Sequence, residues 1–191
     1  VVLVLNSKSS NTIYEYRKVL NILHSHNIFN PVIINKDYNS INKDKVQIAA
    51  SIDFGSLLLD GLGDGVSFFS SKLPPKFTNN LLFDILQGSR KRISQTEYIS
   101  CPSCGRTLFD LEETTARIRS KTSHLKGLKI GVMGCIVNGP GEMADADYGY
   151  VGTGPDKVSL YKKQVLVKRN INTEDALDEL IQLIKDNGNW L

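Results

Sequence analysis

The sequence lacks any apolar run near the roughly 20 residues that a membrane-spanning helix needs, and it has no secretory signal. Neither charge is in large excess, because 23 Lys and Arg oppose 20 Asp and Glu for a formal net charge of +3. Nucleic-acid-binding domains concentrate basic residues on one face, whereas the one dense basic run, residues 89–92, is typical of a solvated linker. We therefore expect no membrane span and no nucleic-acid partner.

An initiator methionine is missing too, since the chain begins VVLVLN. We expect a part of a longer protein, whose targeting segment would lie upstream. Cysteine is scarce, because Cys101, Cys104 and Cys135 are all that the sequence contains. An odd number with one C-x-x-C pair favours metal binding or redox chemistry over a disulfide scaffold.

The first part of the chain alternates between strand and helix patterns, which indicates an α/β fold class. Apolar β-branched runs and helical spacing predict a βαβαβ segment at residues 1–6, 9–27, 31–35, 42–55 and 56–61. Strands in this order are parallel and joined by right-handed crossovers. Residues 1–72 are therefore expected to be the C-terminal part of a larger, barrel-like α/β domain.

Adjacent prolines at 74 and 75 indicate a boundary, so residues 73–94 are expected to be a linker with a short helix at 79–88. Residues 95–191 are then predicted to form a small mixed α/β domain. Its expected elements are strands at 97–100 and 127–134, a helix at 110–125, antiparallel strands at 148–152, 158–162 and 164–169, and a helix at 173–188. Asp110 and Thr173 are the expected N-caps of the two helices.

The cysteines are predicted to follow the carboxyl ends of two parallel strands, where open α/β sheets bind their ligands. A thioredoxin-like redox pair is one interpretation, but its reactive thiol would sit at a helix N-terminus, and Asp110 comes six residues after Cys104. Structural zinc is a second interpretation, which needs a histidine as fourth ligand. His24 and His26 belong to the first region, and His124 lies at the far end of a helix roughly 20 Å long.

An iron–sulfur cluster is a third interpretation, with the vacant fourth position taken by Glu142 in the loop after Cys135. The intervening Asn-Gly-Pro-Gly can fold back, since its glycines allow positive φ and its proline fixes one turn. A carboxylate holds thiolate-loving iron weakly, so that iron would be exchangeable and could act as a Lewis acid. Glu142 as an ordinary exposed loop carboxylate remains open as well.

Two motifs, CPSCGRTLFDLEE (101–113) and GCIVNGPGEMADADYGYVG (134–152), closely resemble the IspG/GcpE family of 4-hydroxy-3-methylbut-2-enyl diphosphate synthases. The resemblance extends through LYKKQVLVKR and LIQLIKDNG, and upstream through GSLLLDGLGDG and LLFDILQGSR. It is to the plant-type, three-domain branch, in which an α/β domain is inserted between the catalytic barrel and the cluster domain. Residues 1–72 would be the end of that inserted domain, and 95–191 the iron–sulfur domain.

This resemblance implies a [4Fe–4S] cluster on Cys101, Cys104 and Cys135, with Glu142 as fourth ligand and catalytic residue and Asn138 near the substrate. It implies an oxidoreductase of the non-mevalonate (MEP) isoprenoid and terpenoid pathway. The reaction would be reductive ring opening and dehydration of 2-C-methyl-D-erythritol 2,4-cyclodiphosphate. A ferredoxin-like electron carrier and a zinc-stabilised binding module are the alternatives.

The implied partners are the cyclodiphosphate, a ferredoxin or flavodoxin-type electron donor, and an N-terminal barrel domain that this chain lacks. The stretch VSFFSS at 66–71 has none of the basic substrate contacts expected of the barrel. We therefore expect this fragment alone to be inactive. A eukaryotic source would imply a plastid-type organelle, and a bacterial one the cytoplasm.

Overall fold

The computed structural model describes residues 1–9 and 11–190, which fold into two compact units that divide between Ile93 and Ser94. Each unit is built on its own sheet, one of three strands and one of five. The predicted α/β fold class is confirmed. No helix among the described residues is long and apolar enough to cross a membrane.

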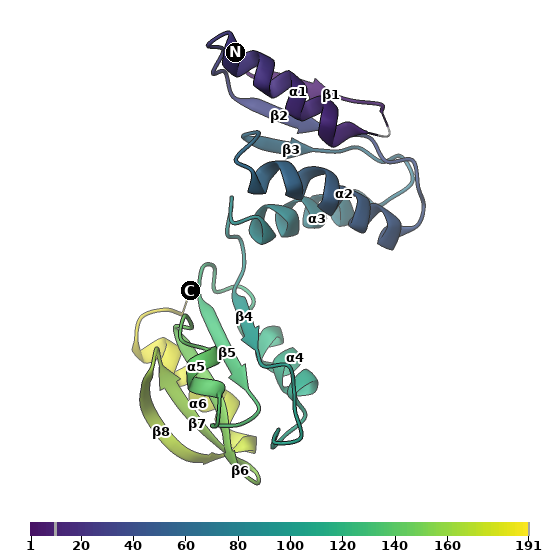
Figure 1. Cartoon of the computed structure of the whole chain (residues 1–191). Helices are drawn as coiled ribbons and strands as arrows, with labels where there is room; N and C mark the ends of the chain where they lie inside the picture. Colours follow the sequence, from purple (N-terminus) through teal and green to yellow (C-terminus); the bar gives the residue numbers. More distant parts are fainter. Residues whose placement is uncertain (10, 191) are drawn as a thin grey trace. The chain divides into compact units, whose positions relative to one another are not determined.

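The first unit is a parallel three-stranded sheet in the order β1-β2-β3, with helices between consecutive strands (Figure 1). Its elements are β1 (Leu3–Asn6), α1 (Thr12–Ser25), β2 (Val32–Asn35), α2 (Lys43–Leu59), β3 (Gly65–Ser67) and α3 (Pro75–Gly88). The core contains Phe54 of α2, which is fully buried, and Tyr38 and Phe68 packed edge to face at 5.4 Å. The predicted order of strands and helices is confirmed, although Ser10 of the first predicted helix lies outside the described residues.

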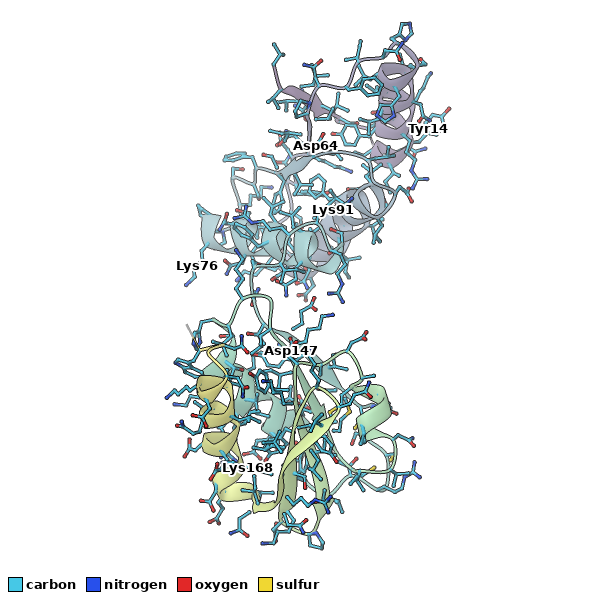
Figure 2. The ribbon with its side chains drawn as sticks, turned by 90° about the vertical axis from the view of Figure 1, so that its left-hand side faces the viewer. Tyr14, Asp64, Lys76, Lys91, Asp147 and Lys168 are labelled. Carbon is cyan, nitrogen blue, oxygen red and sulfur yellow. The ribbon has the colours of Figure 1, made fainter. Side chains whose placement is uncertain are left out.

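The third strand was predicted at the wrong place. Residues 56–59 continue α2 because Leu57 and Leu58 fall on the helical stripe of Phe54 and enter the same core. The strand comes later, at Gly65–Ser67, and pairs with β2. Asp64, which directly precedes β3 and is labelled in Figure 2, fixes this register. Its carboxylate accepts the backbone N–H of Val32 at 2.8 Å.

Helix α3 begins at Pro75, four residues before the predicted start. Proline suits a first helical turn because its missing N–H would have no partner there. Leu81 and Ile85 of α3 are buried in the core of the first unit. The helix is thus part of that unit, whereas the division of the chain into an inserted domain, a linker and a cluster domain stays a prediction.

The second unit is a five-stranded sheet in the order β4-β5-β6-β7-β8. Its elements are β4 (Glu97–Ser100), α4 (Leu111–Thr122), β5 (Lys129–Met133), α5 (Gly139–Glu142), β6 (Tyr148–Gly154), β7 (Lys157–Lys162), β8 (Val165–Asn172) and α6 (Thr173–Asp186). Strands β4 and β5 are parallel, and β6, β7 and β8 are antiparallel, as predicted. The parallel pairing of β6 with β5 was not predicted. One core joins α4 and α6 to the sheet, and a second core lies around Met133 and Met143.

Asp110 caps α4 as predicted, because its carboxylate accepts the N–H of Glu113 at 2.8 Å. Thr173 is not a cap, since it is the first residue of α6. The N-cap is Asn172, whose side chain makes no capping bond. The two helix starts therefore form a natural pair for measuring what a capping bond contributes.

We expect Asp110→Ala to lower the free energy of unfolding of the second unit by about 1 kcal/mol, the usual loss for a capping carboxylate. Asn172→Ala should change it by less, because no capping bond is lost. Urea titration followed by fluorescence of Trp190, the single tryptophan, which packs on His124, measures both. Equal losses in the two variants would contradict this assignment of the cap.

Candidate functional site

Two of the three cysteines follow neighbouring parallel strands. Cys101 comes directly after β4, and Cys135 lies two residues beyond β5. The strands pair in register, Ser100 with Val132, so their carboxyl ends meet at one edge of the sheet as predicted. The backbone N–H of Gly134 donates a hydrogen bond to Sγ of Cys101 at 3.3 Å, and this contact joins the two strand ends.

The third cysteine, Cys104, is exposed in the loop after β4, and all three thiols are free. The loop closes on itself because Thr107 N–H donates to the carbonyl of Cys104 at 2.9 Å and Cys104 N–H donates to Oγ1 of Thr107 at 3.1 Å. Ser103 takes a left-handed conformation, with φ of 56°. The C-x-x-C pair thus lies in a tight turn well before α4, which disagrees with a thiol at a helix N-terminus.

The loop is fastened to the end of β5. Leu108 N–H donates to the carbonyl of Gly134 at 3.1 Å. Gly134 has to be glycine here, since an added Cβ would lie 2.6 Å from Cγ2 of Thr107. The loop and the strand end therefore approach more closely than any side chain at position 134 would allow.

Arg106 brings positive charge to the cysteines. The pKa of the Cys104 thiol is lowered, chiefly by a hydrogen bond from the backbone of Arg106 and next by one from its guanidinium. The pKa of Arg106 is raised by that hydrogen bond and by the charges of Cys104, Cys135 and, more weakly, Glu142. Arg106 therefore interacts electrostatically with three of the four residues expected to bind a cluster.

Glu142 and Asn138 bracket the short helix α5. Glu142 N–H donates to the carbonyl of Asn138 at 3.0 Å, and both side chains are exposed. The helix is anchored by Met143, which is fully buried, and by Gly139, where an added Cβ would lie 2.8 Å from Cβ of Met133. The segment turns back as one helical turn, and this turn does not use the positive φ that glycine allows, because neither Gly139 nor Gly141 is among the positive-φ residues.

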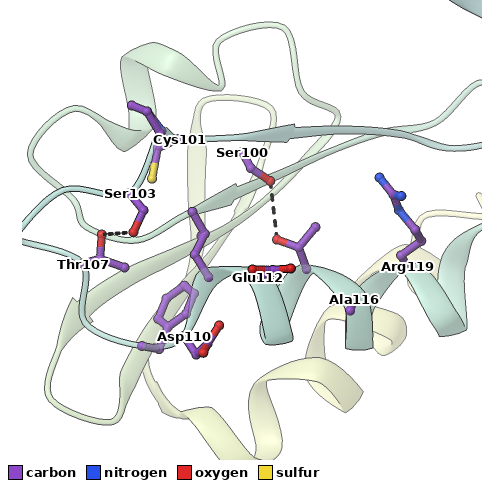
Figure 3. A pocket seen from close by; sticks show the side chains of 12 residues that line it. Ser100, Cys101, Ser103, Thr107, Asp110, Glu112, Ala116 and Arg119 are labelled. Carbon is purple, nitrogen blue, oxygen red and sulfur yellow. Dashed lines mark hydrogen bonds between the residues drawn. The ribbon is translucent and has the colours of Figure 1, made fainter. Parts of the chain in front are cut away.

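A pocket of about 750 Å³ opens beside Cys101, between the end of β4, the C-x-x-C loop and the first turns of α4 (Figure 3). Hydroxyl groups line it in bonded pairs, Ser100 with Thr115 and Ser103 with Thr107, each at 3.4 Å. Asp110, Glu112 and Arg119 add charge at its α4 side. The pocket offers polar groups next to one candidate ligand, and no sequence pattern predicted it.

Among residues 1–9 and 11–190, no three His, Cys, Asp or Glu side chains come together closely enough to hold a metal ion. The histidines considered for zinc have other contacts. His124 packs edge to face on Trp190 at 4.9 Å, and the ring of His24 lies tilted against Phe29 at 5.9 Å in the first unit. A complete set of metal ligands would therefore have to come from the cysteine loops themselves, without these histidines.

Arg106 and Thr107 were not predicted as site residues, although they lie two and three residues after Cys104 in CGRT. Their position near an expected ligand in the same loop was the available signal. What they contact depends on the end of β5, some thirty residues further along the chain, and no local pattern predicts that contact.

Both cysteine loops lie in a part of the chain that matches a known protein family. The family model described as "GcpE protein C-terminal domain" matches residues 97–186. A Porphyromonas gingivalis protein named 4-hydroxy-3-methylbut-2-en-1-yl diphosphate synthase (flavodoxin) is 52% identical over 99% of this chain and 32% of its own length. A chloroplastic rice protein of the same name, with ferredoxin in place of flavodoxin, is 51% identical over 94% of this chain and 24% of its own length. The chain thus spans about a third or less of the length of these relatives.

Proposed function

The chain belongs to the GcpE family, and from that premise we propose that its second unit binds a [4Fe–4S] cluster through Cys101, Cys104 and Cys135, with Glu142 as the fourth ligand. The observation that carries the proposal is the Gly134 N–H to Cys101 Sγ bond, which ties together the strand ends that bear the first and last cysteine. Three free thiols are a donor set that suits iron–sulfur clusters.

The protein's own groups have separable tasks in this proposal. Cys101, Cys104 and Cys135 hold the cluster as thiolates, and Arg106 offsets part of their negative charge. Glu142, a harder ligand on an exposed helix end, leaves one position easily exchanged. When bound, the cluster would supply electrons and one Lewis-acidic iron.

Asn138 is proposed to orient the substrate, because its exposed side chain begins the helical turn that ends on Glu142. The two residues before Asn138 are apolar and exposed, Ile136 at 48% and Val137 at 61%. Apolar side chains beside a reaction centre favour the exclusion of water once another domain covers them. We propose that the barrel domain of the full-length protein covers this loop.

For the full-length protein, we propose the synthase activity that the relatives' names state, formation of 4-hydroxy-3-methylbut-2-enyl diphosphate. As its chemistry we propose the two-electron reductive ring opening and dehydration of 2-C-methyl-D-erythritol 2,4-cyclodiphosphate. Ferredoxin or flavodoxin would supply the electrons, as the relatives' names state for those proteins. Residues 1–72 would be the end of an inserted domain, and the fragment alone would not turn over substrate. The compartment would be a plastid in a eukaryote, as for the rice relative, or otherwise the cytoplasm.

Metal analysis of the full-length protein tests this proposal most directly. After anaerobic reconstitution, we expect iron and labile sulfide in the ratio of a [4Fe–4S] cluster, with an absorption spectrum that responds to the cyclodiphosphate. Zinc without labile sulfide would instead identify a zinc-stabilised module. A cluster that cycles between redox states but is indifferent to the cyclodiphosphate would identify an electron carrier. Cys135→Ala is the matched control, because it removes one ligand.

A further inference from the structure

We propose that Thr107 is a positioning residue that fixes the C-x-x-C loop onto the end of β5, so that the three sulfurs are held in place before a cluster binds. The inference rests on the proposed cluster site and adds a residue that contacts neither substrate nor iron. Its support comes from the two ends of one side chain, the hydroxyl and the methyl group.

The hydroxyl holds the loop that carries Cys104. Oγ1 of Thr107 accepts the backbone N–H of Cys104 at 3.1 Å and also the hydroxyl of Ser103 at 3.4 Å (Figure 3). In return the Thr107 N–H donates to the carbonyl of Cys104 at 2.9 Å. This reciprocal pair defines the direction of the Cys104 backbone, although the loop is exposed and is attached to no strand at this point.

The methyl group holds the end of β5. Cγ2 of Thr107 lies over Gly134, where an added Cβ would be only 2.6 Å away. The next residue, Leu108, donates its N–H to the Gly134 carbonyl at 3.1 Å. Gly134 is thereby fixed from two sides, and it directly precedes Cys135 along the chain.

Gly134 in turn is linked to the other two cysteines, Cys101 and Cys135. Its N–H donates to Sγ of Cys101 at 3.3 Å, and its carbonyl carbon is bonded to the nitrogen of Cys135. One threonine thus contacts the backbone of Cys104 directly and the surroundings of Cys101 and Cys135 through one glycine. Serine would keep the hydroxyl contacts and lose the methyl contact, whereas valine would do the reverse.

Hydrogen bonds to cluster sulfurs also help to set the reduction potential. A donor N–H stabilises the extra negative charge of the reduced state, so the Gly134 to Cys101 bond should raise the potential. If the methyl group of Thr107 holds Gly134 in place, removal of that methyl group should lower the reduction potential. A side chain that only fills space would leave the potential unchanged while it altered stability.

The first test uses the full-length protein without metal and measures amide hydrogen exchange. We expect Thr107→Val to speed exchange at Cys104 by about three- to tenfold, the range for loss of one hydrogen bond. Thr107→Ser should keep Cys104 protected. Thr153→Val is the control, since it removes a hydroxyl whose hydrogen bond goes to Asn170 of β8.

The second test uses the same variants after anaerobic reconstitution and measures iron release to a chelator and the cluster's reduction potential. We expect Thr107→Val, which loses the hydroxyl contacts to the Cys104 loop, to lose iron about tenfold faster than wild type, as is usual for residues that orient ligands. Thr107→Ser, which loses the methyl contact on Gly134, should have a more negative potential, and a wild-type potential in Thr107→Ser would contradict the role of the methyl group. Exchange or release at the wild-type rate in Thr107→Val would overturn the proposal. Wild-type protein that takes up no iron and sulfide would overturn the proposed function, and the role of Thr107 with it.

Discussion

Glu142→Ala in the full-length protein is expected to reduce turnover of the cyclodiphosphate to background while the iron stays bound. The side chain is exposed, so its removal opens no cavity. The helical turn should persist, because the Glu142 N–H to Asn138 carbonyl bond belongs to the backbone and the buried Met143 anchors the segment. Only the carboxylate is lost, and the three thiolates remain to hold the iron.

Turnover is measured with a chemical reductant, and iron retention is measured separately as the iron content of the protein. The absorption spectrum should change, because one ligand is replaced. Asp145→Ala is the matched control, since Asp145 is also an exposed carboxylate three residues further along. It should retain wild-type turnover and spectrum. Normal turnover in Glu142→Ala would remove Glu142 from the site, and loss of iron in both variants would indicate damage to α5 instead.

The parts of the fold that the sequence predicted well have strong periodic patterns and short connections. The parallel β4 and β5, the Asp110 cap and the antiparallel β6, β7 and β8 were all predictable from local residues. The position of the two cysteine loops at one sheet edge followed from strand order alone, because parallel strands have their carboxyl ends on the same side.

The errors occurred where tertiary packing overrode a local pattern. Leu57 and Leu58 are part of a short apolar run that fits a strand, yet the core around Phe54 lies on their helical face and extends α2. This outcome is not encoded in the residues beside them, because it depends on what packs against the element.

The sequence predicts the proposed ligands of the candidate site, since residue type and spacing carry their chemistry, and their role as ligands stays a prediction. Arg106 and Thr107 act through contacts with the end of β5 and could not be predicted from spacing. The same limit applies to Gly134 and Gly152, where the signal is only a missing side chain. The strand ends can lie so close together because neither of these two residues has a side chain.

Gly152→Ala is expected to destabilise the second unit by about 1–3 kcal/mol, the range for overpacking a tight interior. An added Cβ would lie 2.5 Å from the Gly134 carbonyl oxygen and 3.1 Å from Cε1 of Phe109. The nearest atom is backbone, so it cannot turn away as a flexible side chain could. That oxygen also accepts the Leu108 N–H, and the clash should therefore loosen the C-x-x-C loop as well.

Gly154→Ala provides the comparison within the same strand, because its Cβ would lie 3.8 Å from Cβ of Lys157, an ordinary contact. Urea unfolding followed by Trp190 fluorescence should separate the two variants by most of the expected loss, with Gly154→Ala near wild type. Iron retention after reconstitution should fall in Gly152→Ala alone. Equal stability would mean that β6 can move away from Gly134 at little cost. The close approach of the strand ends would then result from the cysteine loops rather than from the sheet.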